Sequence, residues 1–337
     1  MKIAILAPVA WRTPPRHYGP WEQMAGNLAE GLAAKGLDVT LFATADSVTT
    51  GRLSSICAKG YEEDPDADAK VNECMHISYL MEQAGDFDII HNHFDFLPLT
   101  YSRLIKTPMI TTIHGFSSPK ILPVYQRYND RVSYVSISNA DRAPNLEYAA
   151  TVYNGINPAD FAFEPSPDDY LLYYGRIHPD KGTHEAIQIA LHTKRRLIIA
   201  GIVQDEAYYL EKVKPYIDEE QIQYIGPVGG RQRSELLGRA QALLHPILFN
   251  EPFGLSVAEA MHCGTPVIAF NKGSMPELIA DRKTGFLVNN IIEASAAVED
   301  LSLITRRDCH LHASNKFTAE KMVEAYSALY ERLALSH

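Results

Sequence analysis

Two glutamates in the second half of the chain have the spacing and surroundings of a ligand site. Glu251 and Glu259 form an E-x7-E pair. Apolar residues recur at three-residue spacing through 254–262 and Gly264 ends the run, so this segment is expected to be a helix. Glu251 then lies in the loop before the helix, and Glu259 lies on its first turns.

The start of this helix is suited to an anion. The first turn of a helix has unpaired backbone N–H groups and a positive dipole end. The stretch Phe253, Gly254, Leu255 and Ser256 could therefore hold a phosphate, while carboxylates on either side accept hydrogen bonds from hydroxyl groups. A sugar, a diphosphate and a ribose in a row satisfy all three parts, as in a nucleotide-sugar. The plain alternative is a surface loop followed by an ordinary helical glutamate.

The segments after the helix favour the ligand site. They read GTPVIA at 264–269, GSMPELI at 273–279 and TGFLV at 284–288. The whole run resembles the retaining glycosyltransferases of family 4, which have the GT-B fold and an E-x7-E motif. In that family the first glutamate contacts the transferred sugar and the second contacts the ribose hydroxyls. The resemblance assigns these roles to Glu251 and Glu259.

The same resemblance implies further donor-site residues in the second half. Arg176 and Lys181, in the segment GRIHPDKG, correspond to the residues that bind the donor diphosphate. Two fixed cations neutralise a leaving diphosphate without a metal ion, and arginine can do so through two hydrogen bonds. Val228 follows a predicted strand at the place where relatives hold the base through backbone groups. The usual Pro-Ser before the glutamate loop is replaced here by His245-Pro246.

In the first half, the resemblance points to His114 and Gly19. His114 ends the predicted strand 108–113 and matches a histidine that approaches the transferred sugar. A histidine there can donate a hydrogen bond to a hydroxyl or to developing charge without acting as a base. Gly19 matches the first glycine of a Gly-Gly loop near the donor phosphates. Proline, which has no N–H, replaces the second glycine at position 20.

Other polar patterns have weaker meanings. His91 and His93 end a predicted strand, where a structural role is favoured over an orienting or acceptor-side role. No third or fourth ligand is indicated beside them, so we predict no metal site. Asp66-Ala-Asp68 and Asp86-Phe-Asp88 spell D-x-D, and we interpret both as chance, the first in a charged loop and the second leading into a strand.

Alternating strands and helices position these residues. Buried strands are expected at 2–7, 38–43, 88–92, 108–113, 133–138 and 150–153, and then at 170–174, 196–200, 222–225, 242–245 and 266–270. Helices between them imply right-handed crossovers and parallel sheets. The pattern therefore predicts an α/β fold class with two doubly wound domains, and the resemblance implies the GT-B type, in which the two domains face across a cleft. The expected division is an acceptor-side domain 1–160, a donor domain 170–312 and a segment 313–337 whose helix crosses back to the first domain.

Composition restricts the class further. The chain has 337 residues, enough for two domains, and its formal charge of −10 disfavours a general nucleic-acid partner. The four cysteines are widely spaced without a C-x-x-C pair, which favours a reducing cytoplasm over a disulfide framework. No apolar run approaches the ~18 residues of a membrane span.

These observations predict an enzyme of carbohydrate biosynthesis. It would move a hexose from a nucleotide-sugar, UDP-linked in preference to GDP- or ADP-linked, to an acceptor hydroxyl with retention and without a metal or cofactor. The acceptor could be a small molecule, an oligosaccharide or a lipid-linked sugar. The alternatives are an epimerase or phosphorylase on the same fold, and a catalytically silent protein that binds sugar nucleotides.

Overall fold

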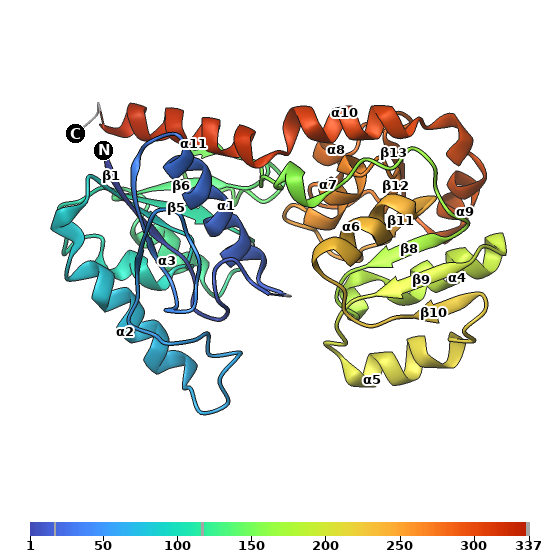
Figure 1. The fold of residues 1–337 in the computed structure, drawn as a ribbon, viewed down its shortest axis with the longest axis horizontal. Coiled ribbons are helices and arrows are strands. Elements are labelled where there is room, and N and C mark those ends of the chain that lie inside the picture. Colours follow the sequence, from blue (N-terminus) through green and yellow to red (C-terminus); the bar gives the residue numbers. More distant parts are fainter. Residues whose placement is uncertain (17, 116–117, 335–337) are drawn as a thin grey trace. The chain divides into compact units, whose positions relative to one another are not determined.

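The computed structural model describes residues 1–16, 18–115 and 118–334. The chain divides into two compact units, one comprising Met1–Gly155 and Ala319–His337 and the other comprising Ile156–Thr318 (Figure 1). The predicted linker 157–169 and the start of the predicted terminal segment, 313–318, thus belong to the second unit. Each unit is an independent α/β body.

The first unit is built on a seven-stranded parallel sheet in the order β3-β2-β1-β4-β5-β6-β7. The strands are β1 (Lys2–Leu6), β2 (Asp38–Phe42), β3 (Arg52–Ser54), β4 (Ile89–Asn92), β5 (Met109–Ile113), β6 (Val132–Ser136) and β7 (Tyr148–Thr151). Its helices are α1 (Pro20–Ala34), α2 (Ala69–Met81), α3 (Leu122–Arg127) and α11 (Ala319–Ala334).

The second unit is built on a six-stranded parallel sheet in the order β10-β9-β8-β11-β12-β13. The strands are β8 (Leu171–Tyr174), β9 (Leu197–Ala200), β10 (Ile222–Tyr224), β11 (Ala242–His245), β12 (Val267–Phe270) and β13 (Gly285–Val288). Its helices are α4 (Thr183–Thr193), α5 (Glu206–Tyr208), α6 (Gly230–Arg239), α7 (Leu255–His262), α8 (Met275–Leu278), α9 (Ile291–Glu299) and α10 (Arg306–Lys316).

The central strands are buried along their whole length because they are covered on both faces, and they are largely apolar, with Thr111 and Thr112 in β5 and His245 in β11 as the polar exceptions. Every residue of β5, β9, β11 and β12 is buried. Parallel sheets with helices on both faces have this continuous pattern instead of an alternating one. The fold class predicted from these runs, two parallel-sheet α/β domains, is confirmed.

Strand order reverses once in each sheet, between β1 and β4 in the first unit and between β8 and β11 in the second. Ligands of doubly wound sheets bind beyond the carboxyl ends of the strands at such a reversal. In the second unit, the loops that leave β8 and β11 there carry Lys181 and Glu251. The topology therefore brings the predicted donor residues to one edge of one sheet.

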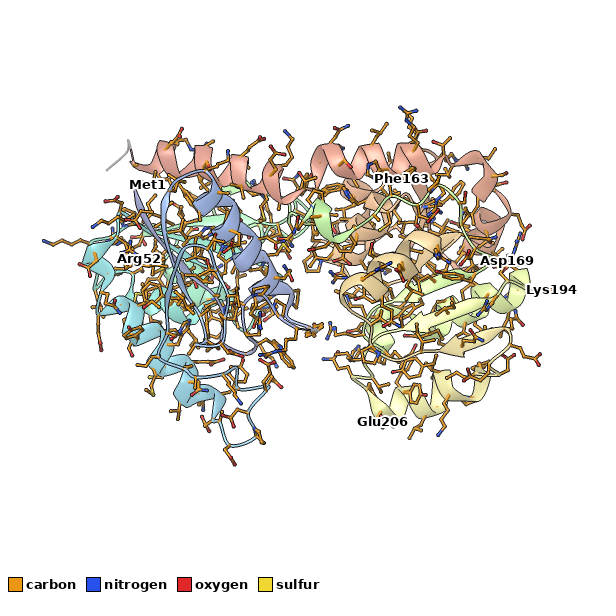
Figure 2. All side chains as sticks on the ribbon, in the orientation of Figure 1. Met1, Arg52, Phe163, Asp169, Lys194 and Glu206 are labelled. Carbon is orange, nitrogen blue, oxygen red and sulfur yellow. The ribbon has the colours of Figure 1, made fainter. Side chains whose placement is uncertain are left out.

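Three elements of the first unit were not predicted: α2, β3 and the short helix α3. α2 occupies 69–81, begins at Asp68, whose carboxylate accepts the Val71 N–H at 3.0 Å, and exposes Val71 and Met75 while burying His76. This mixed pattern has no apolar stripe, so helical periodicity was hidden. β3 is a short edge strand, where Arg52 pairs with Asp38; Figure 2 labels Arg52 on this outer strand.

Candidate active site

The loop that carries Glu251 leads directly into α7. Gly254 is the N-cap, with φ 90°, and its carbonyl accepts hydrogen bonds from the N–H groups of Val257 at 3.0 Å and Ala258 at 3.4 Å. The amides of Leu255 and Ser256 thus belong to the first turn, where N–H groups have no partner within the helix. The helix starts one residue later than predicted, but its N-terminus lies where the anion site was expected.

Gly273 and Ser274 hold this loop in place. A side chain at Gly273, which has φ +57°, would lie 2.4 Å from both N and O of Glu251, so only glycine allows this approach. The Ser274 N–H donates to the Glu251 carbonyl at 2.9 Å, and the Ser274 hydroxyl donates to the carbonyl of Phe253 at 2.7 Å. Phe253 is itself buried against Phe317, with ring centroids 5.8 Å apart. The sequence segment GSMPE therefore positions the glutamate.

Lys181 and Glu251 form the central ion pair of the second unit. Lys181 Nζ donates to Glu251 Oε2 at 2.5 Å, and the two side chains are only 15% and 12% exposed. Lys181 also lies over the ring of Phe249, 4.6 Å from its centroid. Removing either partner would leave a largely desolvated charge, which is costly. The pair thus joins two residues that the resemblance assigns to different parts of the donor, Lys181 to the diphosphate and Glu251 to the transferred sugar.

Arg176 lies on the same loop as Lys181 but makes different contacts. Its guanidinium donates to the side-chain carbonyl of Gln204, and its own backbone carbonyl accepts a hydrogen bond from Tyr173 at 2.8 Å. The loop then closes against the next one, where the Leu248 N–H donates to the Asp180 carbonyl at 2.8 Å. Arg176 and Lys181 are therefore fixed on one rigid connection.

Glu259 is buried on α7 beside a cation that the sequence did not reveal. Arg233 Nη1 lies 3.5 Å from Glu259 Oε1, and the guanidinium also lies 4.9 Å from the centroid of the Phe161 ring. Burial raises the pKa of Glu259, and the positive charge of Arg233 opposes that rise. Nearby, the Tyr174 hydroxyl donates to the carbonyl of buried Val228 at 3.5 Å. Arg233 thus keeps a buried carboxylate available for hydroxyl donors.

His114 lies in the first unit, just after β5. It is buried, its ring stacks on Trp21 with centroids 5.7 Å apart, and its Nε2 is 2.8 Å from Nδ1 of His93. Burial lowers the pKa of His114 to about 3, so the ring is neutral at pH 7. Its Nδ1 has no hydrogen-bond partner within the described part of the chain. His114 is thus a neutral hydrogen-bonding group oriented by His93.

His91 is a structural residue. Its Nδ1 is 2.6 Å from the hydroxyl of Tyr330, and its Nε2 is 2.8 Å from the Thr112 hydroxyl, which in turn is 2.7 Å from the Tyr326 hydroxyl. Both ring nitrogens are therefore satisfied by α11 and β5. Of the two histidines at the end of β4, His93 contacts a predicted site residue and His91 ties the terminal helix to the first unit.

The loop around Gly19 ends at the start of α1. Gly19 is the N-cap with φ 147°, and Pro20 is the first helical residue, where a missing N–H is tolerated. Glu22 accepts the Trp11 N–H at 3.2 Å, and burial raises its pKa to about 7. Proline at position 20 thus contributes to helix initiation instead of offering a phosphate contact.

The two D-x-D segments have structural roles. Asp68 is the N-cap of α2, and Asp88 accepts the N–H of Lys2 at 2.7 Å. A search of the described residues finds no cluster of three or more histidine, cysteine, aspartate or glutamate side chains arranged for a metal ion.

The structure brings some of the predicted site residues into contact and leaves others apart. Lys181 contacts Glu251 directly, and Glu259 lies on the helix that Glu251 precedes. His114 and Gly19 belong to the other unit. Arg233, His245, Gly273 and Ser274 were not assigned roles from the sequence. The motif GSMPE could have identified two of them, whereas Arg233 has no local signal because its partner is distant in sequence.

Comparison with known proteins shows which family this chain resembles. The family model described as "Glycosyl transferases group 1" matches residues 159–319, and the model described as "Glycosyltransferase Family 4" matches residues 22–159. These matches identify a glycosyltransferase, and the two parallel sheets agree with the GT-B fold. The chain belongs to the family 4 glycosyltransferases.

Its relatives are distant but span most of the chain. Glycogen synthase of Mycobacterium tuberculosis is 25% identical over 335 residues, covering 82% of this chain and 80% of its own. Phosphatidyl-myo-inositol mannosyltransferase of Propionibacterium freudenreichii is 24% identical, covering 95% and 91%.

Solved structures share the fold over the full length. AviGT4, a glycosyltransferase involved in avilamycin A biosynthesis, matches with a TM-score of 0.75 at 24% identity, covering 100% of this chain and 99% of its own. Anabaena HepE, solved with UDP and glucose, matches with a TM-score of 0.75 at 17% identity, covering 97% and 98%. None of the helices in the described part of the chain combines the length and apolarity needed to cross a membrane.

Proposed function

We propose that this glycosyltransferase moves a hexose from a nucleotide-sugar to an acceptor hydroxyl with retention of configuration and without a metal ion. The observation that carries the proposal is the Lys181–Glu251 pair at the mouth of α7, with Nζ and Oε2 2.5 Å apart. A cation for phosphate, a carboxylate for sugar hydroxyls and the amides of the first turn of α7 meet there.

In this proposal, the diphosphate binds between Arg176, Lys181 and the first turn of α7. Residues 253–256 supply backbone N–H groups at the positive end of the helix dipole. Two cations and a helix terminus stabilise the charge that develops on the leaving phosphate, as a divalent ion does elsewhere. This is why we infer that no metal ion is needed.

The remaining donor groups have partners on either side of the phosphates. Glu251 accepts hydrogen bonds from the transferred sugar, and Glu259 accepts them from the ribose hydroxyls. The base lies near Val228, whose carbonyl the Tyr174 hydroxyl already contacts. These assignments extend the family resemblance to specific residues of this chain.

The reaction breaks the bond between the anomeric carbon and the β-phosphate oxygen, and forms a bond from that carbon to the acceptor oxygen. Attack on the same face gives retention, and the acceptor proton passes to the departing phosphate oxygen. The family resemblance assigns His114, which is neutral because burial lowers its pKa to about 3, a hydrogen bond to the sugar and not removal of the proton. No covalent nucleophile is required in this scheme.

We infer a UDP-sugar as donor because HepE, which shares the fold, was solved with UDP and with UDP-glucose. GDP- and ADP-sugars are the other donors to test. The names of the relatives include glycogen synthase and a phosphatidyl-myo-inositol mannosyltransferase. Small-molecule, oligosaccharide and lipid-linked acceptors therefore all belong in a screen. The four free cysteines fit the reducing cytoplasm as the compartment.

Thermal unfolding with UDP, GDP and ADP, followed by transfer assays with the matching sugar nucleotides, tests this function. One nucleotide at ~100 times its Kd should stabilise the protein by about 2.7 kcal/mol, a shift of several degrees in Tm. Lys181→Met should reduce transfer by at least about 100-fold. The control Lys283→Met, which removes an exposed lysine of the same unit, should not.

Each contrary result has a defined meaning. Conversion of the sugar nucleotide without an acceptor would indicate an epimerase, and formation of a sugar 1-phosphate from a glycoside and inorganic phosphate would indicate a phosphorylase. Nucleotide binding without turnover across the acceptor panel would indicate a silent binding protein. Normal transfer by Lys181→Met would refute the site.

A further inference from the structure

His245 is a buried histidine without a hydrogen-bond partner on one ring nitrogen. It is the last residue of β11, beside the strand reversal, and the residue is only 6% exposed. Its Nε2 is buried and has no hydrogen-bond partner among the described residues. Buried polar atoms in folded proteins are nearly always paired, so an unpaired one needs an explanation.

The unpaired nitrogen lies beside the central ion pair. His245 Nε2 is 3.8 Å from Glu251 Oε2, the same oxygen to which Lys181 Nζ donates at 2.5 Å. Burial, with the positive charge of Lys181, lowers the pKa of His245 to about 3, so the ring is neutral. A neutral ring with its proton on Nε2 can donate to this carboxylate, but 3.8 Å is too long for a hydrogen bond.

Lys181 and Glu251 cannot keep their present contact unchanged if both bind the donor. A diphosphate attracts Lys181, and Glu251 then loses its cation while its side chain is only 12% exposed. A carboxylate in such a place needs a replacement donor. Nε2 of His245 is the unpaired group already facing the same oxygen.

We propose that His245 is a positioning residue that replaces Lys181 as the partner of Glu251 when the donor diphosphate binds. The inference rests on the proposed function. Nε2–H of His245 donates to Oε2 and keeps the carboxylate aimed at the transferred sugar. Oε2 of Glu251 thus contacts Lys181 before the donor binds and His245 afterwards. The histidine affects the sugar only through Glu251.

Two substitutions separate this role from simple packing. His245→Leu fills a similar volume without a donor, and His245→Gln places an amide N–H near the position of Nε2. We expect His245→Leu to weaken UDP binding about 10- to 100-fold, because the hydrogen bond to the charged carboxylate forms only when the diphosphate is bound. The variant should also lose about tenfold or more in kcat, because Glu251 is no longer held in position for the transferred sugar. His245→Gln should recover most of kcat.

Exposed His192 of α4 provides the control: His192→Leu should leave kcat, KM and Tm unchanged. Full activity in His245→Leu would overturn the inference. An equal loss of kcat in His245→Leu and His245→Gln, together with a lowered Tm, would also overturn the inference, because a packing role predicts that pattern.

A second experiment does not need turnover. In protein labelled with ¹⁵N-histidine, the Nε2–H resonance of His245 should move downfield when saturating UDP forms the new hydrogen bond. Lys181→Met should show the same resonance without any nucleotide, since Glu251 has lost its lysine. The signal is assigned by its absence from His245→Gln.

The two arms distinguish the two proposals. If Lys181→Met shows the shifted resonance and no nucleotide produces it in wild type, the ability of His245 to replace Lys181 as the partner of Glu251 stands, while diphosphate binding at this site fails and the proposed function fails with it. If the resonance is unchanged both in Lys181→Met and in wild type saturated with UDP, the exchange is refuted whatever the enzyme transfers.

Discussion

The assignment of Glu259 to the ribose makes a prediction that depends on single hydroxyl groups of the ligand. Arg233 Nη1 lies 3.5 Å from Oε1 of the buried carboxylate, which leaves Oε2 and a second lone pair for hydroxyl donors. A hydrogen bond to a charged group contributes about 1.5–3 kcal/mol when its loss leaves that group unpaired. Two ribose hydroxyls at the lower value contribute about 3 kcal/mol together.

The test therefore changes both partners of the contact, the ribose hydroxyls of the ligand and the carboxylate of Glu259. Wild-type protein should bind UDP about 100-fold more tightly than 2′,3′-dideoxy-UDP, since 1.4 kcal/mol corresponds to a factor of ten. In Glu259→Ala the preference should fall to within about threefold, because the lost hydroxyls no longer have a carboxylate to contact. Isothermal titration calorimetry measures the four dissociation constants, and the coupling between residue and ligand follows from their ratio.

The controls address the charge left behind. Glu259→Ala leaves Arg233 without its carboxylate, so the double variant Glu259→Ala/Arg233→Met tests whether an unpaired guanidinium distorts binding. Glu220→Ala removes an exposed glutamate of the same unit and should keep the full preference. If Glu259→Ala weakens both ligands equally and the 100-fold preference persists, Glu259 does not bind the ribose.

Three further predictions concern the scaffold. The Arg306 guanidinium donates to the carbonyls of Glu164, Ala240 and Gly238 and to the Thr265 hydroxyl. Arg306→Ala should therefore lower the free energy of unfolding by about 3 kcal/mol in a urea titration, whereas Arg307→Ala, at an exposed residue, should change it by less than about 0.5 kcal/mol. Gly273→Ala should reduce kcat/KM by at least about tenfold because its Cβ would lie 2.4 Å from the backbone of the glutamate loop; Gly36→Ala, with φ +81° and nothing within 4 Å, should retain kcat/KM. Glu22 holds its proton to about pH 7 when folded, against 4.5 for an ordinary glutamate. Stability should therefore fall by up to about 3 kcal/mol as the pH rises through this window, and Glu22→Gln should abolish that fall in thermal unfolding at pH 5 and pH 8.

The sequence was most informative where local pattern and burial agree. Strands such as β9 and β12 are continuous apolar runs, and these runs predicted buried parallel strands with an error of one residue at the N-terminal end. α2 was missed because the helix exposes apolar side chains and buries a histidine. The helix packs against the rest of the first unit through both polar and apolar residues, so its sequence has no apolar stripe at helical spacing.

The site was predictable to the extent that its chemistry is carried by local motifs. Glu251, Glu259 and Lys181 lie in segments with recognisable spacing, and the structure adds that Lys181 and Glu251 share a contact at 2.5 Å. Arg233 could not be found because it meets Glu259 only through the packing of α6 against α7. The orphaned nitrogen of His245 is likewise a property of the folded core and not of the residues next to it.

The pairing of charges in the second unit has a consequence for selectivity. The chain carries a formal charge of −10, yet its carboxylates at the site are matched by cations, Lys181 with Glu251 and Arg233 with Glu259. A free nucleoside diphosphate can attract Lys181 only by separating it from Glu251. In the proposed function, a complete nucleotide-sugar brings the anion for Lys181 and also hydroxyl donors for Glu251, whereas a free nucleoside diphosphate leaves Glu251 with His245 alone as its replacement partner. The enzyme should therefore prefer the intact donor over its nucleotide product, and it should lose that preference when the lysine and the glutamate are no longer paired, as in Lys181→Met.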